Sequence, residues 1–536
     1  MIRNIHNPAS RLWSKDTTLW QGDEVDPRAI LDRLGWLDVF GWINKHLAEI
    51  DQWVQETVAS NRFQRTVVLG MGGSSLAPEV FSKLFAAAPG HPSLTVLDST
   101  SPDMVKSVLE QGVQNTLFVV ASKSGTTLET MDLYRFFYGQ VGMLSNTASD
   151  QFVAITDADS WLEQHALSEK FNKTFINPHD IGGRYSALSL FGIVPAALHG
   201  VDVSSIIERA HQFAETTKSD DPDLNPALTL GSDMAIHAMN GQDKLILSLT
   251  PALESLGAWI EQLVAESTGK GGQGILPVCE SASGPGYHGG DAFKVLISDD
   301  QNIKSVGSGH GAEREWYLGD VLDIGAEFFK WEFATAIAAS YLGVNPFDEP
   351  NVTEAKKSTD RFINHGENLD KYVIADSPYF RVEGIGDSWV DSELPDVPWS
   401  VLKPTNGGYL SVLAYLPMED GCTLALEQMR NLICDQLRAV CTVGFGPRYL
   451  HSTGQLHKGG APVGTFLQLT SDSSIDFAIP GRDYTFNDLF NAQADGDIAV
   501  LAARGLPVMR VYLKGDRLHA IQELCDAFSK SLNTLN

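Results

Sequence analysis

Short apolar segments alternate with longer amphipathic ones along most of the chain, beginning at about residue 66. Runs rich in β-branched residues occur at 66–69, 94–97, 117–120, 152–155 and 174–176. Segments of helical length and composition, such as 103–111 and 128–138, separate them. Strands that alternate with helices are typical of βαβ units, which form parallel sheets with helices on both faces. We therefore predict a doubly wound α/β fold for this part of the chain.

A second series of the same kind follows a polar, acidic stretch at residues 215–225, which has the composition of a domain boundary. Its strands are expected at 244–249, 293–297, 409–416, 442–445, 465–469 and 508–513. Tryptophans among charged positions in the first 53 residues indicate amphipathic helices packed on a larger body. The sequence thus predicts two doubly wound parallel-sheet α/β domains with flanking helices, at residues 1–225 and 226–536, with an irregular insertion near 358–400.

The overall charge limits the partners of the protein. The chain has 39 basic and 67 acidic residues, a net charge of −28, which disfavours nucleic acid and anionic membranes but permits a small anion at a local site. The longest apolar stretch, near 188–198, is too short to span a bilayer, and the N-terminus lacks the apolar region of a secretory signal. The five cysteines include no CxxC pair, which suits free thiols in a reducing compartment. We expect a cytoplasmic protein.

Two turns in the first domain have the composition of phosphate-binding loops. Residues 70–75 (GMGGSS) and 121–127 (ASKSGTT) each follow a predicted strand and precede a predicted helix. Glycines allow close backbone approach, helix N-termini offer unpaired N–H groups, and hydroxyls and Lys123 add donors. Ordinary turns with Thr126 or Thr127 as an N-cap are the alternative. Neither loop has the Walker pattern or the third glycine of the dinucleotide fingerprint. A phosphorylated small molecule therefore fits better than NAD or ATP.

Acid–base chemistry has candidates in three other places. Glu266 lies four residues after Gln262 on one helical face and can act as a base if burial raises its pKa. Arg184 follows two glycines and can stabilise an oxyanion. His451 and His457 lie in a dense polar cluster and can act as acid or base. A metal site there is discounted, because no third ligand has a recognisable spacing. Taken singly, each residue is more commonly structural or on the surface.

Five motifs together resemble the glucose-6-phosphate isomerases, a family built from two sugar-isomerase α/β domains. They are residues 70–78 (GMGGSSLAP), 122–130 (SKSGTTLET), 182–186 (GGRYS), 262–270 (QLVAESTGK) and 345–356 (NPFDEPNVTEAK). With residues 448–460 (RYLHSTGQLHKGG), the chain is most similar to the isomerase part of the bacterial bifunctional transaldolase/glucose-6-phosphate isomerases. No transaldolase domain is visible in the sequence.

The resemblance implies an aldose–ketose isomerase that interconverts glucose 6-phosphate and fructose 6-phosphate through a cis-enediolate, without cofactor or metal. It implies that Glu266 moves the proton between C2 and C1, that Arg184 stabilises the charge that develops, and that His451 opens the ring with help from Lys356. The substrate-binding residues that it implies are Ser74, Ser122, Lys123, Ser124, Thr127, Gly183 and Gln262. Because the family usually forms dimers that share active sites, a homodimer is expected.

The sequence departs from the family pattern in two ways. The lysine segment usually lies near the C-terminus and after the histidine, whereas here 180 residues follow Lys356 and His451 is among them. His288 is therefore an alternative for ring opening. Glu349 stands where the family usually has glutamine, and it would repel a phosphosugar unless it pairs with Lys356. An isomerase of another sugar phosphate, such as mannose 6-phosphate, and a non-catalytic sugar-phosphate-binding protein are the competing hypotheses.

Overall fold

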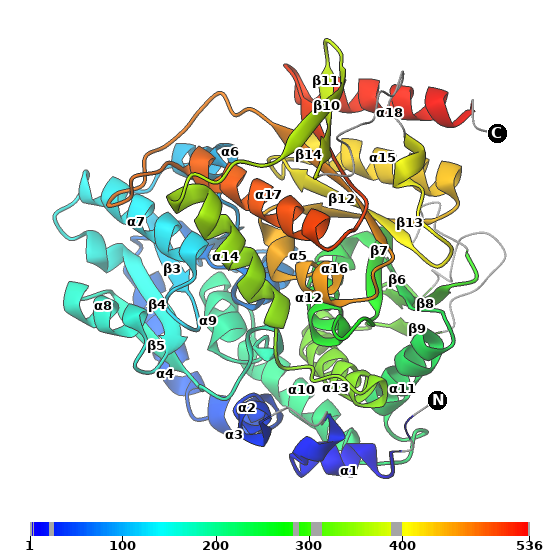
Figure 1. The fold of residues 1–536 in the computed structure, drawn as a ribbon. Coiled ribbons are helices and arrows are strands. Elements are labelled where there is room, and N and C mark those ends of the chain that lie inside the picture. Colours follow the sequence, from blue (N-terminus) through cyan, green and yellow to red (C-terminus); the bar gives the residue numbers. More distant parts are fainter. Residues whose placement is uncertain are drawn as a thin grey trace.

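The computed structural model of the protein describes residues 3, 5–20, 26–281, 289–301, 314–386 and 399–533. Within these residues the strands form three sheets, and helices cover the faces of the sheets (Figure 1). The predicted α/β class, with parallel sheets and flanking helices, is confirmed. None of the described helices is long and apolar enough to cross a membrane.

The first sheet has five parallel strands in the order β2-β1-β3-β4-β5. Its strands are β1 (Arg65–Leu69), β2 (Ser93–Leu97), β3 (Thr116–Ala121), β4 (Phe152–Asp157) and β5 (Lys173–Asn177). The chain leaves β1 toward one side of the sheet and returns on its other side to form β3. In open α/β sheets, ligands bind beyond the carboxyl ends of the strands at such a switch point. The two predicted phosphate-binding turns follow β1 and β3, and so lie at this edge.

Side chains alternate between the two faces of the first sheet and join two separate hydrophobic clusters. Val68 and Val119 belong to one cluster, and Val67 and Val120 belong to the other. The first cluster includes α4 (Leu47–Ala59), α5 (Leu76–Leu84) and α9 (Leu190–His199), and the second includes α6 (Pro102–Glu110), α7 (Leu128–Gly142) and α8 (Trp161–Glu169). Helices therefore cover both faces, as the fully buried strands β1 and β3 require.

The second half of the chain contains two sheets, whereas the sequence predicted one. The second sheet is fully parallel, in the order β7-β6-β8-β9, and consists of β6 (Lys244–Leu249), β7 (Leu276–Ser281), β8 (Ala292–Ser298) and β9 (Arg314–Tyr317). The third has the order β10-β11-β15-β14-β12-β13. A hydrophobic cluster that contains Ile246, Leu276, Leu413 and Val440 joins the two sheets. The predicted boundary at 225/226 falls between α10 (Val203–Thr216) and α11 (Pro226–Met239) and stays a prediction.

The third sheet is mixed, because its first two strands form an antiparallel hairpin. Its strands are β10 (Lys371–Asp376), β11 (Phe380–Ile385), β12 (Tyr409–Tyr415), β13 (Val440–Phe445), β14 (Gly464–Ser471) and β15 (Val508–Leu513). A connection of three residues, 377–379, forces β10 and β11 to be antiparallel. The prediction of an irregular insertion near 358–400 was therefore wrong for 371–385. β10 (KYVIAD) is an exposed edge strand, and the acidic, proline-containing sequence around it indicated loops.

Helices pack on both faces of the third sheet. α15 (Asp420–Leu437) and α18 (Arg517–Asn533) contribute to the cluster on one face, and α17 (Phe486–Ala503) contributes to the cluster on the other. α14 (Pro350–Asn364) runs beside α17 (Figure 1) and carries the predicted Lys356. The short helix α16 (Gly454–Gly459) follows a 3-10 turn at Arg448–His451, which carries the predicted histidine.

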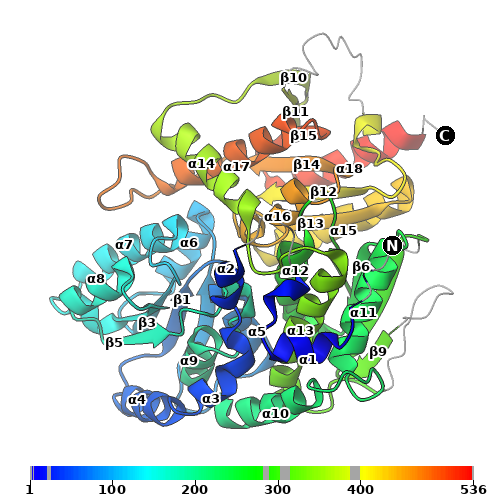
Figure 2. The same cartoon turned by 60° about the horizontal axis from the view of Figure 1, so that its bottom comes forward.

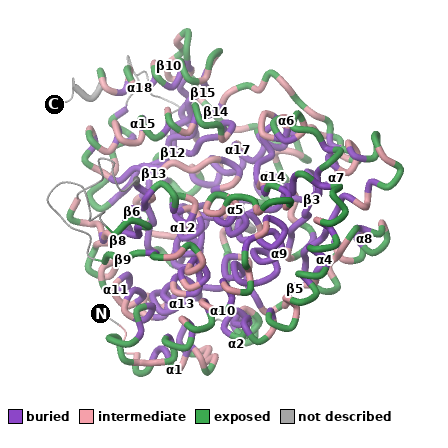
Figure 3. Tube along the Cα trace, turned by 180° about the vertical axis from the view of Figure 1, so that it is seen from behind, coloured by how far each residue is buried: buried purple, intermediate pink, exposed green. Residues whose placement is uncertain are grey.

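The two central helices are α12 (Glu254–Thr268) and α13 (Ile324–Leu342), which are buried along most of their length (Figure 3). The N-terminal helices α1 (Pro8–Trp13), α2 (Pro27–Leu31) and α3 (Val39–Ile43) lie on the surface next to α10 and α13 (Figure 2). The Trp20 indole N–H donates to the Ala336 carbonyl oxygen at 2.8 Å. Tryptophans thus anchor the N-terminal helices to the larger body, as the sequence predicted.

Candidate active site

A cavity of about 460 Å³ lies between the turns after β1 and β3, the end of α12, and the loops that lead to α14 and α16. The predicted site residues that line it are Ser74, Lys123, Ser124, Thr127, Gly183, Arg184, Gln262, Glu266, Lys356 and His451. Ser122 is buried behind the lining, where its Oγ lies 3.0 Å from the Thr127 Oγ1. His288 is outside the described residues. Residues far apart in the sequence therefore converge on one cavity.

The turn after β1 is pressed against its neighbours so closely that two of its positions require glycine. Gly72 has a φ of +54°, and a Cβ on it would lie 2.6 Å from the Gln262 Nε2. A Cβ on Gly73 would lie 1.9 Å from the carbonyl oxygen of Gly183. Side chains at these positions would push the turn away from α12 and from residues 182–186. The glycines thus bring three of the predicted motifs into contact.

The turn after β3 leads directly into α7 and leaves polar groups at the helix N-terminus. Thr127 is the N-cap residue, but its side chain makes no capping hydrogen bond within the helix. The Thr127 hydroxyl therefore does not cap α7. Ser124 is exposed, and its Oγ accepts a hydrogen bond from the Thr126 hydroxyl at 3.0 Å. Ser124 and Thr127 thus line the cavity at the N-terminus of a helix, an arrangement that suits a phosphate group.

The Lys123 side chain already has protein partners. Its Nζ forms an ion pair with Asp157, at the end of β4, and donates to the His179 carbonyl oxygen at 2.7 Å. The carboxylate of Asp157 offsets the charge of the lysine at this end of the cavity. Asp157 therefore already offsets part of the positive charge that Lys123 was predicted to offer to a phosphate group.

Glu266 is held at the end of α12 with a partner on each carboxylate oxygen. Its Oε1 lies 3.2 Å from the Arg184 Nη1, and its Oε2 accepts from the Gln262 Nε2 at 3.1 Å. The side chain is 9% exposed. Burial raises the pKa of the Glu266 carboxyl; the positive charge of Arg184 acts to lower it, and the negative charge of Glu349 adds to the rise. A buried carboxylate with a raised pKa is suited to proton abstraction near neutral pH.

Arg184 is buried and is fixed by the loop that precedes α14. Its Nη2 donates to the carbonyl oxygens of Pro346 and Asp348 at 2.7 and 2.8 Å, and its Nη1 lies 3.2 Å from the Glu349 Oε2. Glu349 therefore pairs with Arg184, and not with Lys356. The guanidinium is a planar group that reaches Glu266 and Glu349 at once, whereas the Lys356 side chain is exposed on α14.

Lys270 holds the same loop from its other side. Its Nζ donates to the Asn345 carbonyl oxygen at 2.5 Å and forms an ion pair with the Asp348 carboxylate at 2.7 Å. Burial lowers the pKa of Lys270 to about 8. Two buried cations thus fix the start of α14, and with it the position of Lys356 at the cavity. The sequence marked Lys270 only as the end of a motif.

His451 forms a pair with a carboxylate that the sequence analysis did not assign to the site. Its Nε2 lies 3.0 Å from the Glu129 Oε1, which also accepts from the Gln493 Nε2 at 2.8 Å. Burial acts to raise the pKa of Glu129, but the charge and hydrogen bond of His451, a backbone hydrogen bond and the charge of Lys356 together lower it below its usual value. The His451 carbonyl oxygen accepts from the Gln262 Nε2 at 2.7 Å. The histidine is thus oriented from both its ring and its backbone.

Glu129 was missed because an acidic residue in the first turn of a helix has an ordinary explanation. Such residues interact favourably with the helix dipole. Its position inside the motif at 122–130 was the one available signal. His457, the other histidine of the polar cluster, is buried, is not among the residues that line the cavity, and has its Nδ1 2.8 Å from the Tyr409 hydroxyl. Burial lowers its pKa to about 3, so His457 is neutral at ordinary pH.

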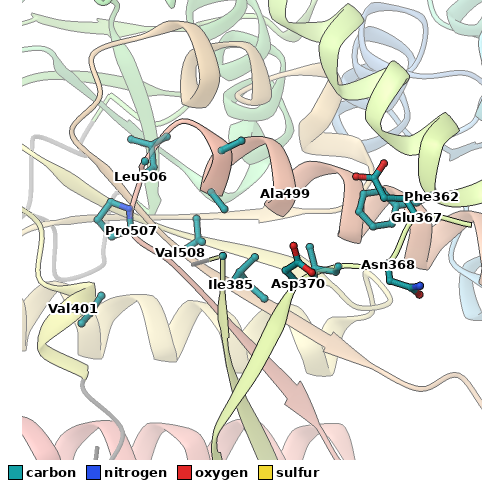
Figure 4. Close-up of a pocket in the computed structure, with 15 residues that line it drawn as sticks. Phe362, Glu367, Asn368, Asp370, Ile385, Val401, Ala499, Leu506, Pro507 and Val508 are labelled. Atoms are coloured by element: carbon teal, nitrogen blue, oxygen red, sulfur yellow. The ribbon is translucent and has the colours of Figure 1, made fainter. Parts of the chain in front are cut away.

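A larger cavity, of about 670 Å³, lies beside α17 and the ends of β11 and β15 (Figure 4). Its lining is mostly apolar and includes two carboxylates, Glu367 and Asp370, but no cationic side chain among the described residues. A phosphate group would be repelled there. Size alone is therefore a poor guide, and the chemistry of the lining favours the smaller cavity as the candidate active site.

Known proteins are similar to this chain in sequence. A family model described as "Phosphoglucose isomerase" matches residues 39–292. The match covers less than half of the chain, and across these residues the chain is similar to that family. A glucose-6-phosphate isomerase from Methanocaldococcus jannaschii is 30% identical over 230 residues, which are 42% of this chain and 56% of that protein. One from Synechococcus elongatus is 25% identical over 418 residues, which are 68% of this chain and 78% of that protein.

The fold of the family is also found among solved structures. A glucose-6-phosphate isomerase from Chlamydia trachomatis matches with a TM-score of 0.52 and 18% identity, over 68% of this chain and 80% of that one. This likeness concerns the fold alone. The alignment with the Methanocaldococcus protein spans little more than half of that relative. The family match includes the two turns, Arg184, Gln262 and Glu266, whereas Lys356 and His451 lie beyond it.

Proposed function

We propose that the protein interconverts glucose 6-phosphate and fructose 6-phosphate, with Glu266 as the base. The observation that carries the proposal is the pairing of Glu266 with Arg184 in the same cavity as the two phosphate-binding turns. A site that only bound a sugar phosphate would need the turns but not a buried carboxylate held against a guanidinium. The family match and the names of the relatives support the same activity.

In the proposed mechanism, the phosphate binds at the turns after β1 and β3, and this remote contact aligns the reacting carbons with Glu266. Glu266 removes the proton from C2 of the open-chain aldose, and the electrons move to the carbonyl oxygen to give a cis-enediolate. Arg184 stabilises the negative charge on that oxygen. The proton of the C2 hydroxyl then moves to the C1 oxygen, and the Glu266 carboxylic acid returns its proton to C1. The C2 oxygen becomes the carbonyl of the ketose, C1 carries the hydroxyl, and the carboxylate is regenerated.

Ring opening precedes these steps and is assigned to His451. The imidazole transfers the proton between the ring oxygen and the C1 hydroxyl, with Lys356 beside it in the cavity. The Glu129 carboxylate orients the ring of His451, since the Glu129 Oε1 and the His451 Nε2 are 3.0 Å apart. The pair belongs to a single chain, so ring opening needs no histidine from a second subunit.

The activity is tested with purified protein, in both directions of the reaction and in D₂O. Isomerase action predicts formation of fructose 6-phosphate from glucose 6-phosphate, with solvent deuterium appearing at C2 of recovered glucose 6-phosphate. Mannose 6-phosphate, assayed in parallel, tests the isomerase of another sugar phosphate. Binding of glucose 6-phosphate without product and without deuterium would favour the non-catalytic binding protein and contradict our proposal.

We further propose a cytoplasmic homodimer. The support is the family resemblance together with five cysteines that form no disulfide in the structure. Light scattering coupled to size-exclusion chromatography should give a mass near twice the 58.4 kDa of the chain. A monomer at micromolar concentration would contradict the dimer without affecting the proposed reaction.

Replacing His451 with asparagine is expected to slow turnover of cyclic glucose 6-phosphate by about 10²-fold or more, the ordinary contribution of a general acid–base group. A four-carbon aldose 4-phosphate cannot close to a ring, so its proton exchange in D₂O should change little. Glu129→Gln should also slow turnover of cyclic glucose 6-phosphate more than proton exchange of the aldose 4-phosphate, but by a smaller factor than His451→Asn. His211→Asn changes an exposed histidine on α10 and is the control. Equal losses with both substrates would contradict a role in ring opening.

Replacing Glu349 with glutamine should move the acidic limb of the pH profile of kcat/KM to lower pH. The limb follows ionisation of Glu266, because only the carboxylate accepts a proton, and Glu349 contributes to the raised pKa of Glu266. Removing the negative charge therefore lowers this pKa and leaves the base ionised at more acidic pH. Glu354→Gln, an exposed change on the same helix, is the control. A limb that stays in place or moves to higher pH would contradict the coupling.

A further inference from the structure

Arg33 lines the phosphate end of the cavity, although it comes from the N-terminal segment and precedes the residues that match the family model. It shares the lining with Ser74, Ser124 and Thr127. We infer that Arg33 binds the phosphate group of the substrate and gives this site its preference for a dianion. The inference rests on the proposed function, because it adds a binding residue to the same site.

The backbone around Arg33 is fixed to the loop that precedes Arg184. Leu34 forms an antiparallel bridge with Ile181, and the Gly35 N–H donates to the Asp180 carbonyl oxygen at 2.8 Å. Ile30 and Leu34 are fully buried on either side of the arginine. The N-terminal segment is thus held against residues 180–181. This attachment gives Arg33 a defined position relative to the cavity.

The side chain of Arg33 extends over the first glycine of the 182–186 motif. A Cβ on Gly182 would lie 3.4 Å from the Arg33 Cδ. The Arg33 Nη1 donates to the Asp32 carbonyl oxygen at 2.9 Å. No carboxylate of the described residues comes within ion-pair distance of this guanidinium, whereas Lys123 is paired with Asp157 and Arg184 with Glu266. Arg33 therefore brings a charge to the phosphate end that is not already neutralised by a direct partner.

The charge balance of the cavity depends on this residue. The cationic side chains in the lining are Arg33, Lys123, Arg184 and Lys356, and the carboxylates are Asp157, Glu266 and Glu349. With the histidines neutral, the lining has one excess positive charge, and without Arg33 it has none. A protein with a net charge of −28 needs such a local excess to hold a phosphate dianion. Arg33 also lies near enough to act on Asp157: burial raises the pKa of that carboxyl, while Lys123 and Arg33 act to lower it.

The test is Arg33→Gln, which removes the charge and keeps a polar side chain of similar reach. We expect KM for fructose 6-phosphate to rise about tenfold with kcat within twofold, because a charge-assisted bond to a non-reacting group is equally strong in the ground and transition states. The inhibition constant of inorganic phosphate should rise by a similar factor. Arg33→Lys should recover part of the loss, and Arg28→Gln, at an exposed position on α2, should behave like the wild type.

Two further measurements separate this inference from the proposed function. Phosphate affinity measured by calorimetry at pH 5.5 and 7.5 should rise with pH in the wild type, as the dianion forms, and rise less in Arg33→Gln. This measurement needs no turnover, so it tests Arg33 even if the wild type is not an isomerase. Unchanged KM and unchanged phosphate affinity in a folded Arg33→Gln protein would overturn the inference. A wild type that binds no phosphate would overturn both proposals.

Discussion

Replacing Glu266 with glutamine is expected to lower kcat by about 10²- to 10⁴-fold, with KM for glucose 6-phosphate changed by less than about threefold. Glutamine keeps the shape of the side chain and can still accept a hydrogen bond from Arg184, so the substrate should bind almost normally. It cannot take a proton from carbon. An interaction that acts only in the transition state lowers kcat and kcat/KM together. Steady-state kinetics in both directions, with deuterium incorporation from D₂O, would measure this loss.

A matched control lies on the same helix. Glu261→Gln makes the same chemical change five residues earlier on α12, at a residue that does not line the cavity. Burial raises the pKa of Glu261 to about 8, so glutamine there replaces a group that is largely uncharged at neutral pH. We expect turnover close to that of the wild type. Near-normal turnover in Glu266→Gln itself would show that the base has been wrongly assigned, whatever the control does.

Replacing Arg184 with glutamine should lower both activity and stability. Loss of a charge that stabilises the enediolate is expected to reduce kcat by about 10²- to 10³-fold. Glu266 is buried, and removing its cation from a buried pair commonly costs about 3–5 kcal/mol of the free energy of unfolding. The carbonyl oxygens of Pro346 and Asp348 would also lose their donor. Kinetics and chemical denaturation of the same preparation would measure the two effects.

A variant of Lys270 distinguishes the effect of Arg184 on the reaction from its effect on stability. Lys270→Met removes the other cation that holds the loop at 345–348, but it removes no direct contact with Glu266. We expect a comparable loss of stability with a smaller loss of kcat. The double variant Arg184→Gln/Glu349→Gln should regain part of the stability, since one uncompensated carboxylate is gone, but not the activity. Equal effects of Lys270→Met and Arg184→Gln on kcat would mean that Arg184 acts only by positioning the loop.

Local sequence patterns predicted much of the fold because they depend on nearby residues. The apolar run at 66–69 became β1, and the run at 508–513 became β15 with the predicted bounds. The glycine-rich turns after β1 and β3 could be assigned to one edge, since parallel strands end on the same side of a sheet. β10 was missed although it contains the apolar run YVIA, because the acidic and proline-containing residues around it indicated irregular loops.

The grouping of strands into sheets lay beyond these patterns. The six strands predicted in the second half became β6, β8, β12, β13, β14 and β15, whereas β7, β9, β10 and β11 were not predicted. Composition does not say which neighbour a strand pairs with. The second and third sheets share a hydrophobic cluster but not a hydrogen-bonded edge in the described residues, so the division into two sheets was not predicted.

By itself, the sequence predicted most of the strands of the parallel sheets and the polar residues at the two glycine-rich turns, because periodicity and turn chemistry act over a few neighbouring positions. Only the tertiary structure decided which charged side chains pair with each other. Glu129 pairs with His451, Asp157 with Lys123, and Glu349 with Arg184. The tertiary structure also decided that Arg33 reaches the same cavity. These pairings join residues that are up to 322 positions apart. They depend on how three sheets and the N-terminal helices pack together, which no local pattern encodes.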